Sequence, residues 1–118
     1  MSRAKGTWGE AQVAAYLRKS GYELLAHSYH CRFGEIDLIA RQGKILCFVE
    51  VKTRTNLQCG LPRDYVTVAK QEKLRKTAAF YLMEKDLDCP VRFDVAEVYS
   101  DDMHRPGSIR IEYLENAF

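Results

Sequence analysis

The stretch that decides the fold of this 118-residue chain is GEIDLIARQGKILCFVEVKTRT, residues 34–55. Its two halves are rich in Ile, Leu, Val and Phe. They predict strands over Glu35–Arg41 and Lys44–Thr53, with a hairpin turn at Gln42-Gly43. The second strand is apolar on both faces around Phe48, so we expect it to be central in a sheet and covered on both sides.

The elements on either side of this hairpin complete a mixed α/β sheet with helices on its faces. In chain order they are a helix over Thr7–Lys19, a strand over Tyr22–Tyr29, the hairpin, a loop over Arg54–Arg63, a helix from an N-cap at Thr67 to about Lys85, a strand over Val91–Tyr99, a turn over Ser100–Gly107 and an edge strand over Ile109–Leu114. The predicted order is α-β-β-β-α-β-β, and we expect residues 1–118 to form one domain.

Both helices are indicated by apolar residues at helical spacing. In the first, Val13, Ala14 and Leu17 share one face, and Gly21 follows the last turn as a C-cap. In the second, an apolar stripe runs from Leu74 to Leu82.

Composition places the chain among globular proteins, with 47% hydrophobic and 29% charged residues. The longest strictly apolar run, Ile45–Val49, is far shorter than the roughly 20 residues that span a bilayer. Residues 1–12 carry no apolar segment of signal-peptide type. We therefore expect a cytoplasmic protein that does not enter a membrane and whose 4 cysteines are reduced.

A small cluster of metal-binding residue types occurs at His27, His30 and Cys31. Tetrahedral zinc sites usually draw on two such clusters, and the only other histidine is the isolated His104. A structural zinc site is therefore not expected.

Charge is distributed unevenly along the chain. Residues 1–85 carry 15 Lys and Arg against 8 Asp and Glu, whereas residues 86–118 carry 3 against 8. The basic part is compatible with a polyanionic partner such as nucleic acid. A solvated surface of mixed charge explains the same numbers.

Acidic and basic side chains also stand in the two strands that should be most buried. Glu50 and Lys52 are two residues apart on a strand, so both side chains point to the same face. With the turn at Gln42-Gly43, Asp37 pairs near Phe48, within diagonal reach of Glu50. Two carboxylates that converge beside a lysine form a site for a divalent cation. An ion pair of Lys52 with Glu50 or Asp37 is the alternative, and spacing alone leaves it open.

Mg²⁺ suits such a site because it takes oxygen ligands and keeps several waters. It polarises a phosphoryl oxygen and activates a bound water. A neighbouring lysine orients that water or offsets the charge that develops on the phosphate. The pattern therefore points to chemistry on a phosphate ester.

Glu10 has two interpretations. It precedes Val13, Ala14 and Leu17 by three, four and seven residues, which places it on the core-facing stripe of the first helix. The run Thr7-Trp8-Gly9-Glu10 also fits a capping box, in which Glu10 satisfies backbone N–H groups, and the residues alone favour the cap.

Further polar residues are candidates for contacts with phosphates. Lys70 and Gln71 extend the stripe of the second helix back by one turn, and Arg54 and Arg63 stand in the loop beyond Lys52. Solvation of a first helical turn and of a polar loop is the alternative, and for Lys70 and Gln71 the residues alone favour it. Arg92 and Asp94 share a strand face, and we expect them to form an ion pair.

The hairpin with Asp37 and Glu50-Val51-Lys52 resembles the active-site signature of the PD-(D/E)xK nucleases, the restriction-endonuclease-like superfamily. The predicted order of elements resembles their core. The likeness is closer to one bacterial family, the uncharacterised YraN family, and covers nearly the whole chain. It comprises the blocks Gly6–Glu10, Gly34–Ile39, Phe48–Arg54, Val66–Gln71, Arg92–Val95 and Glu115–Phe118.

The resemblance implies a restriction-endonuclease-like fold and a role for each matching residue. Asp37 and Glu50 would be metal ligands, the backbone carbonyl of Val51 a third ligand, and Lys52 the catalytic lysine. Glu10 matches the acid that the first helix contributes in archaeal Holliday-junction resolvases. Gln71 matches the helix glutamine of some relatives.

The implied activity is hydrolysis of phosphodiester bonds in DNA, dependent on Mg²⁺ or Mn²⁺, with branched or damaged DNA as substrate. Because the chain has no base-reading motif, we expect selection of DNA structure rather than of a sequence. The small size suits a homodimer, as in related resolvases. The alternative is a non-catalytic nucleic-acid-binding or assembly module on the same fold, and dependence on a divalent metal distinguishes the two.

Overall fold

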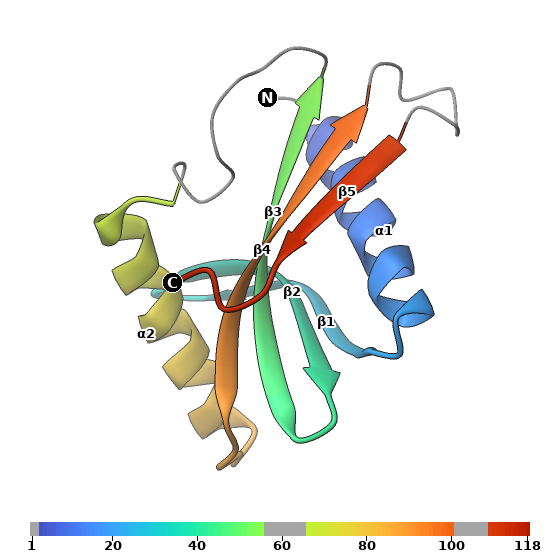
Figure 1. Ribbon diagram of the computed structural model, residues 1–118. Coiled ribbons are helices and arrows are strands. Elements are labelled where there is room, and N and C mark those ends of the chain that lie inside the picture. Colours follow the sequence, from blue (N-terminus) through green and yellow to red (C-terminus); the bar gives the residue numbers. More distant parts are fainter. Residues whose placement is uncertain (1–2, 56–65, 101–108) are drawn as a thin grey trace.

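A five-stranded mixed β-sheet forms the middle of the protein, with a helix on each side of it (Figure 1). The computed structural model describes residues 3–55, 66–100 and 109–118. Its elements are α1 (Arg3–Lys19), β1 (Glu23–Cys31), β2 (Gly34–Gln42), β3 (Ile45–Thr55), α2 (Val68–Glu84), β4 (Val91–Ser100) and β5 (Ile109–Leu114). The predicted α/β class and the order α-β-β-β-α-β-β are confirmed.

The strands lie side by side in the order β1-β2-β3-β4-β5. β3 and β4 are parallel and are joined through α2, and every other neighbouring pair is antiparallel. β3 is therefore the central strand, as its apolar sequence predicted.

The β2–β3 hairpin turns one residue later than expected. β2 ends at Gln42 and β3 begins at Ile45, so the turn is Gly43-Lys44 rather than Gln42-Gly43. Gly43 takes a φ of +60° at the first turn position, where type II′ hairpin turns require glycine. The register moves with the turn, because Leu38 pairs with Val49 and Ile39 with Phe48. Asp37 is thus not opposite Phe48.

Each face of the sheet is covered by one helix, and each helix has its own apolar cluster. On the α1 side the buried residues are Val13, Ala14, Leu17, Tyr22, Leu38, Ala40, Cys47, Val49, Ala96 and Val98. On the α2 side they are Ile36, Ile39, Leu46, Phe48, Val66, Leu74, Ala78, Tyr81, Phe93 and Val95. Alternate residues of β3 thus point into opposite clusters, which explains why this strand is apolar on both faces.

The helix ends show which local signals were sufficient. Gly21, with a φ of +90°, ends α1 as predicted, and the N–H of Tyr22 reaches the carbonyl of Leu17 at 2.9 Å. Thr67 caps α2, and its Oγ1 accepts from the N–H of Lys70 at 3.2 Å. The start of α1 was predicted wrongly, since the helix begins at Arg3 and Thr7 lies inside it.

Four strands run further than predicted: β1 reaches Cys31, β2 spans Gly34–Gln42, and β3 and β4 are longer at their carboxyl ends. β3 continues through Arg54 and Thr55, and β4 continues to Ser100, because the two pair in parallel as far as Thr55 and Ser100. Arg54 is therefore a strand residue and not a loop residue. The remainder of the predicted loop and of the turn after β4 lies outside the described residues.

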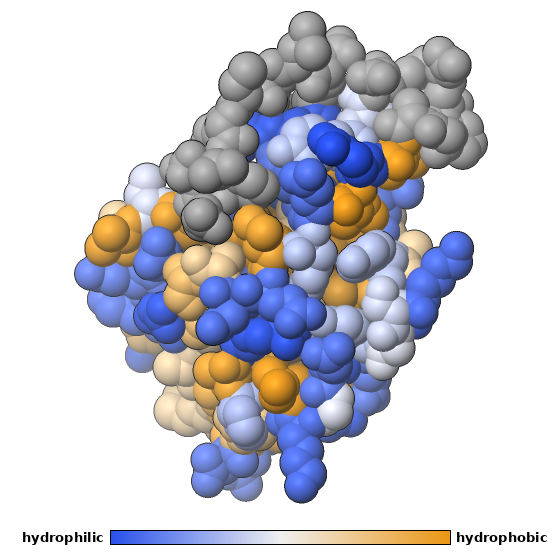
Figure 2. All heavy atoms as spheres, in the orientation of Figure 1, coloured by the Kyte–Doolittle hydropathy of each residue, from blue (hydrophilic) through white to orange (hydrophobic). Residues whose placement is uncertain are grey.

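The C-terminal segment crosses from β5 over β4 towards α2 (Figure 1). The N–H of Ala117 donates to the carbonyl of Phe93 at 2.7 Å, and the rings of Phe93 and Phe118 stack at 5.3 Å. The Arg75 guanidinium lies 4.8 Å from the centroid of the Phe93 ring. Figure 2 shows hydrophilic residues gathered where this segment crosses, with hydrophobic residues interspersed around them. Neither helix is long and apolar enough to cross a membrane, as far as the described ranges extend.

Candidate metal and phosphate site

Two acidic side chains meet where β2 and β3 stop pairing. The last described pair beyond the turn is Leu38 with Val49, and the next residues on the two strands are Asp37 and Glu50. The Asp37 carboxylate accepts the backbone N–H of Val51 at 2.8 Å. The side chain thus takes a donor of β3 at the point where the two strands separate.

Side chains of β2 point alternately to the two faces of the sheet, and this alternation is broken at Asp37. Leu38 packs on the α1 side, whereas Ile36 packs on the α2 side. Residues two apart on a regular strand share a face, so β2 must twist at Asp37. This irregularity lets Asp37 lean towards Glu50, and it could not be anticipated from an alternating pattern.

The two carboxyl groups strongly influence each other. Glu50 is only 6% exposed. Burial raises the pKa of Asp37 to about 8, the nearby Glu50 acts in the same direction, and the Val51 N–H opposes both. Without a compensating cation, this pair of acids therefore holds a proton near neutral pH.

Two lysines stand next to Glu50. Lys52, on the same face of β3, has its Nζ 3.8 Å from Glu50 Oε2. Lys70, in the first turn of α2, contacts the same carboxylate oxygen. The prediction that Glu50 and Lys52 point to one face is therefore confirmed. Lys70 of α2 adds a second cation to the site.

The two ammonium groups differ in their electrostatic setting. Burial lowers the pKa of Lys52, a hydrogen bond with Lys70 lowers it further, and Glu50 acts in the opposite direction. Burial is also the largest single influence on Lys70 and lowers its pKa, but the hydrogen bond and charge of Glu50, together with Lys52 and Asp37, outweigh burial and leave the pKa of Lys70 raised. Lys52 is the amine of the pair that releases its proton more easily.

Glu10 approaches Asp37 from the α1 side of the sheet. Its charge raises the pKa of Asp37 further, and Ser28 donates a hydrogen bond from Oγ to Glu10 Oε1 at 3.0 Å. The capping-box interpretation is wrong, because Thr7 lies within α1. A Cβ on Gly9 would lie 2.0 Å from Thr53 Oγ1, so glycine at this position lets α1 come close to β3 and brings Glu10 to the site.

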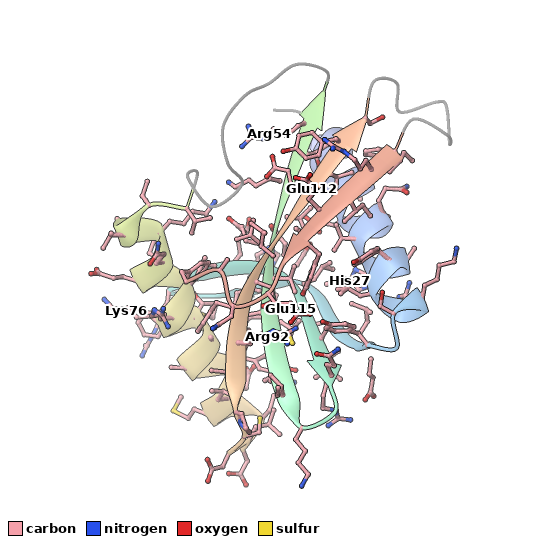
Figure 3. The ribbon with its side chains drawn as sticks, viewed as in Figure 1. His27, Arg54, Lys76, Arg92, Glu112 and Glu115 are labelled. Carbon is pink, nitrogen blue, oxygen red and sulfur yellow. The ribbon has the colours of Figure 1, made fainter. Side chains whose placement is uncertain are left out.

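The other candidate residues have different positions. Gln71 donates from Nε2 to the carbonyl of Val66 at 3.0 Å, which ties down the start of α2. Arg54, near the end of β3 in Figure 3, pairs with Glu97 of β4. Arg63 lies outside the described residues. Of the three that lie in the described ranges, Lys70 is the residue that contacts the acid pair.

Glu97 was not anticipated from the sequence. It is 1% exposed, and the parallel register places it beside Lys52. Burial raises the pKa of Glu97, while Arg54 and Lys52 lower it. An acid inside the apolar run of β4 was the available signal.

Arg92 and Asp94 form the expected ion pair, and it belongs to a larger network on the α1 side. Arg92 Nε lies 2.9 Å from Asp94 Oδ1, and Arg92 also donates to the hydroxyl of Tyr22 at 2.8 Å. Tyr113 and the backbone N–H of Asn116 donate to Asp94 as well. Figure 3 shows Arg92 near Glu115, to which its Nη1 lies at 3.6 Å. This network anchors β5 and the C-terminal segment.

His27 and His30, the two histidines within the described ranges, are not part of a common metal-binding group. His27 is exposed, and His30 lies 3.0 Å from Glu35. Over the described ranges, no group of three or more His, Cys, Asp or Glu side chains is arranged to hold a metal ion. A cation at Asp37 and Glu50 would therefore have two carboxylate ligands and would need backbone carbonyls or water for the rest, which is the way in which Mg²⁺ is commonly held.

Comparison with known proteins places these residues in a widespread family. The profile of Uncharacterised protein family UPF0102 matches residues 9–98. A UPF0102 protein of Chlorobium chlorochromatii is 46% identical over 115 residues, covering 96% of this chain and 89% of the relative. A UPF0102 protein of Caldicellulosiruptor saccharolyticus is 38% identical over 117 residues, covering 98% of each chain. The chain therefore belongs to UPF0102, which is the YraN family that its motifs resemble.

Proposed function

We propose that this protein is a metal-dependent endonuclease that hydrolyses phosphodiester bonds in DNA. The observation that supports this most directly is the meeting of Asp37 and Glu50 beside Lys52 and Lys70 at the point where β2 and β3 separate. Two ionised carboxylates next to a bound phosphate would repel it unless a cation lay between them.

The donor set fits Mg²⁺ or Mn²⁺. Asp37 and Glu50 offer hard carboxylate oxygens, and the carbonyl of Val51 is the third proposed ligand. Burial and mutual repulsion make this acid pair unfavourable as two bare anions, and that is the condition a divalent cation relieves. When bound, the cation polarises the phosphoryl oxygen and favours ionisation of water.

The lysines have separate roles in this proposal. In hydrolysis, the oxygen of a water molecule bonds to phosphorus, one P–O ester bond breaks, the water releases a proton and the leaving oxygen takes one up. Lys52, on the same face of β3 as Glu50, is suited to orient that water. Lys70, whose pKa is raised, is suited to offset the negative charge that grows on the phosphate.

The proposed substrate class rests on the resemblance to nucleases and on the lack of a base-reading motif. The exposed basic side chains of α2 suit contacts with phosphates, which carry no sequence information. We therefore propose structure-selective cleavage of branched or damaged DNA in the cytoplasm. A homodimer would extend the short stretch of DNA that one chain covers.

A non-catalytic nucleic-acid-binding or assembly module is the second candidate. It is favoured by one observation: Lys52 and Lys70 both contact Glu50, so the site is partly neutralised without metal. In that case the cluster would be an ion-pair network, and substitution of Asp37 would leave binding intact or tighten it.

The deciding experiment is a cleavage assay on duplex, single-stranded, flapped and four-way DNA with Mg²⁺, Mn²⁺ or EDTA. Asp37→Asn and Lys52→Met should abolish metal-dependent cleavage. Matched controls are Asp88→Asn, an exposed acid after α2, and Lys76→Met, on the outer side of α2 in Figure 3. Cleavage that persists in both site variants would refute the assignment, and the absence of cleavage on every substrate would favour the binding module.

A further inference from the structure

Phe33, Phe80 and Arg32 form an aromatic cluster at the turn between β1 and β2, separate from the Asp37–Glu50 acid pair. Phe33 is 38% exposed, although it is a large apolar residue. Its ring centroid is 5.9 Å from that of Phe80 on α2, with the planes at 63°. The Arg32 guanidinium lies 4.9 Å from the centroid of the Phe33 ring. The turn thus presents an aromatic ring and a planar cation together at the surface.

This turn is packed against α2 at a defined place. A Cβ on Gly34 would lie 3.1 Å from Thr77 Oγ1, so the chain passes close to the helix there. Figure 1 shows the β1–β2 end of the sheet reaching behind α2. Phe33 and Phe80 are therefore held by two regular elements and not by a long loop.

One flank of α2 connects the cluster to the acid pair. Lys70, Lys73, Thr77 and Phe80 follow one another at spacings of three, four and three residues, so they lie on one side of the helix. Lys70 contacts Glu50, and Lys73 is exposed between the acid pair and Phe80. From Lys70 to Phe80 the helix rises about 15 Å.

The path along β2 gives a similar length. Gly34, next to Phe33, precedes Asp37 by three residues, which corresponds to about 10 Å of strand. Stacked nucleotides in one strand are spaced about 3.4 Å apart. The aromatic cluster therefore lies roughly three or four nucleotides from the acid pair.

Resting on the proposed nuclease function, we infer that Arg32, Phe33 and Phe80 form a stacking platform for an unpaired base of the substrate, with Lys73 contacting the phosphates between that base and the acid pair. Aromatic rings and arginine planes stack on bases irrespective of their identity. Bases inside a duplex are stacked on each other and cannot reach such a platform. The substrate is thus a strand with a single-stranded segment next to the cleaved bond, as in a flap or a fork.

Charges next to the platform are compatible with this ligand. Glu35 is engaged by His30 at 3.0 Å, and Glu84 accepts a hydrogen bond from Tyr29 at 3.0 Å. Arg32 and Lys73 are exposed and supply the positive charge that attracts a DNA strand.

The test measures binding without cleavage, in Ca²⁺, to three fluorescently labelled DNA probes. They are a single strand, its duplex and a strand of the same length in which every base is absent. Phe33→Leu keeps an apolar contact with Phe80 but removes the π face, whereas Phe33→Tyr keeps the ring. Met83→Ala removes an exposed apolar residue of α2 that lies outside the platform.

We expect Phe33→Leu to weaken single-strand binding about 5- to 140-fold, which corresponds to the ~1–3 kcal/mol of one stacked base. Duplex and base-free strand should bind Phe33→Leu and the parent protein equally, and Phe33→Tyr and Met83→Ala should bind all probes like the parent. Circular dichroism shows whether each variant is folded. An equal loss on all three probes, or no loss on the single strand, would overturn the inference while leaving the proposed nuclease intact. Base-dependent binding by a protein that cleaves no substrate would support the platform and refute the nuclease, and a parent protein that binds none of the probes would refute both.

Discussion

Replacing Asp37 with Asn should stabilise the metal-free protein at alkaline pH, although it removes the proposed metal site. The folded protein raises the pKa of Asp37 from 3.8 to about 8. Between about pH 4 and about pH 8, the folded state therefore holds a proton that the unfolded chain has released. Stability must fall as the pH rises through this range, and the loss is complete once Asp37 is ionised in the folded protein.

The size of this effect follows from the shift. Each pKa unit corresponds to about 1.36 kcal/mol. Asp37 is only half-buried, so water screens part of the penalty, and we expect about 2–4 kcal/mol at pH 9. An asparagine has no charge to desolvate, and its side-chain oxygen still accepts the N–H of Val51.

Urea unfolding from pH 5 to pH 9 in EDTA measures this difference. At pH 5 the advantage of Asp37→Asn should be small, because the unfolded parent has only begun to gain from ionising Asp37, and at pH 9 the variant should be more stable by the full amount above. The exposed Asp88→Asn should show no such trend. Mg²⁺ at pH 8 should stabilise the parent and not Asp37→Asn. A difference between parent and Asp37→Asn that does not change with pH would refute the electrostatic account of the acid pair.

Other contacts give further predictions. Asp94→Ala removes the main charged partner of the largely buried Arg92 and the acceptor of Tyr113 and Asn116, and it should lower the free energy of unfolding by about 3–5 kcal/mol, measured in urea. Gly9→Ala should cost about 1–3 kcal/mol, and Thr53→Ala in the same chain should restore part of it, because the added Cβ meets Thr53 Oγ1. Lys70→Met removes a cation that competes for Glu50, so Mn²⁺ affinity by calorimetry should rise about five- to tenfold, for a contact worth ~1–1.4 kcal/mol, while cleavage falls.

Local sequence signals predicted the helices and strands but not the register in which β2 and β3 pair. Apolar periodicity and the caps at Gly21 and Thr67 were sufficient for the helices, since both depend on neighbouring residues. The hairpin was misplaced by one residue because either residue of Gln42-Gly43 could begin a turn. Only the backbone shows that Gly43 occupies the first turn position. That one step changed the residue opposite Asp37 from the vicinity of Phe48 to that of Glu50.

The candidate site was predicted in part for the same reason. Glu50 and Lys52 lie on one strand, so their common face follows from spacing alone. The approach of Lys70 to Glu50 depends on how α2 docks on the sheet, and Glu10 depends on where α1 begins. Neither the position of Lys70 nor that of Glu10 can be predicted from neighbouring residues in the sequence. The first turn of α1 also has no acidic residue to mark its start.

The acid at Asp94 and the acid pair at Asp37 differ in their partners, and this difference bears on the role of each. Asp94 accepts hydrogen bonds from Arg92, from Tyr113 and from the N–H of Asn116, so its carboxylate is fully compensated and holds the C-terminal segment in place. Asp37 accepts one backbone N–H, lies beside Glu50 and faces the charge of Glu10, and the two lysines of the site contact Glu50. A network that served only stability could be built like the first one, or replaced by apolar residues at no loss. The chain instead interrupts the β2–β3 ladder and keeps an acid whose charge destabilises the metal-free fold, which is the arrangement expected of a site that a divalent cation completes.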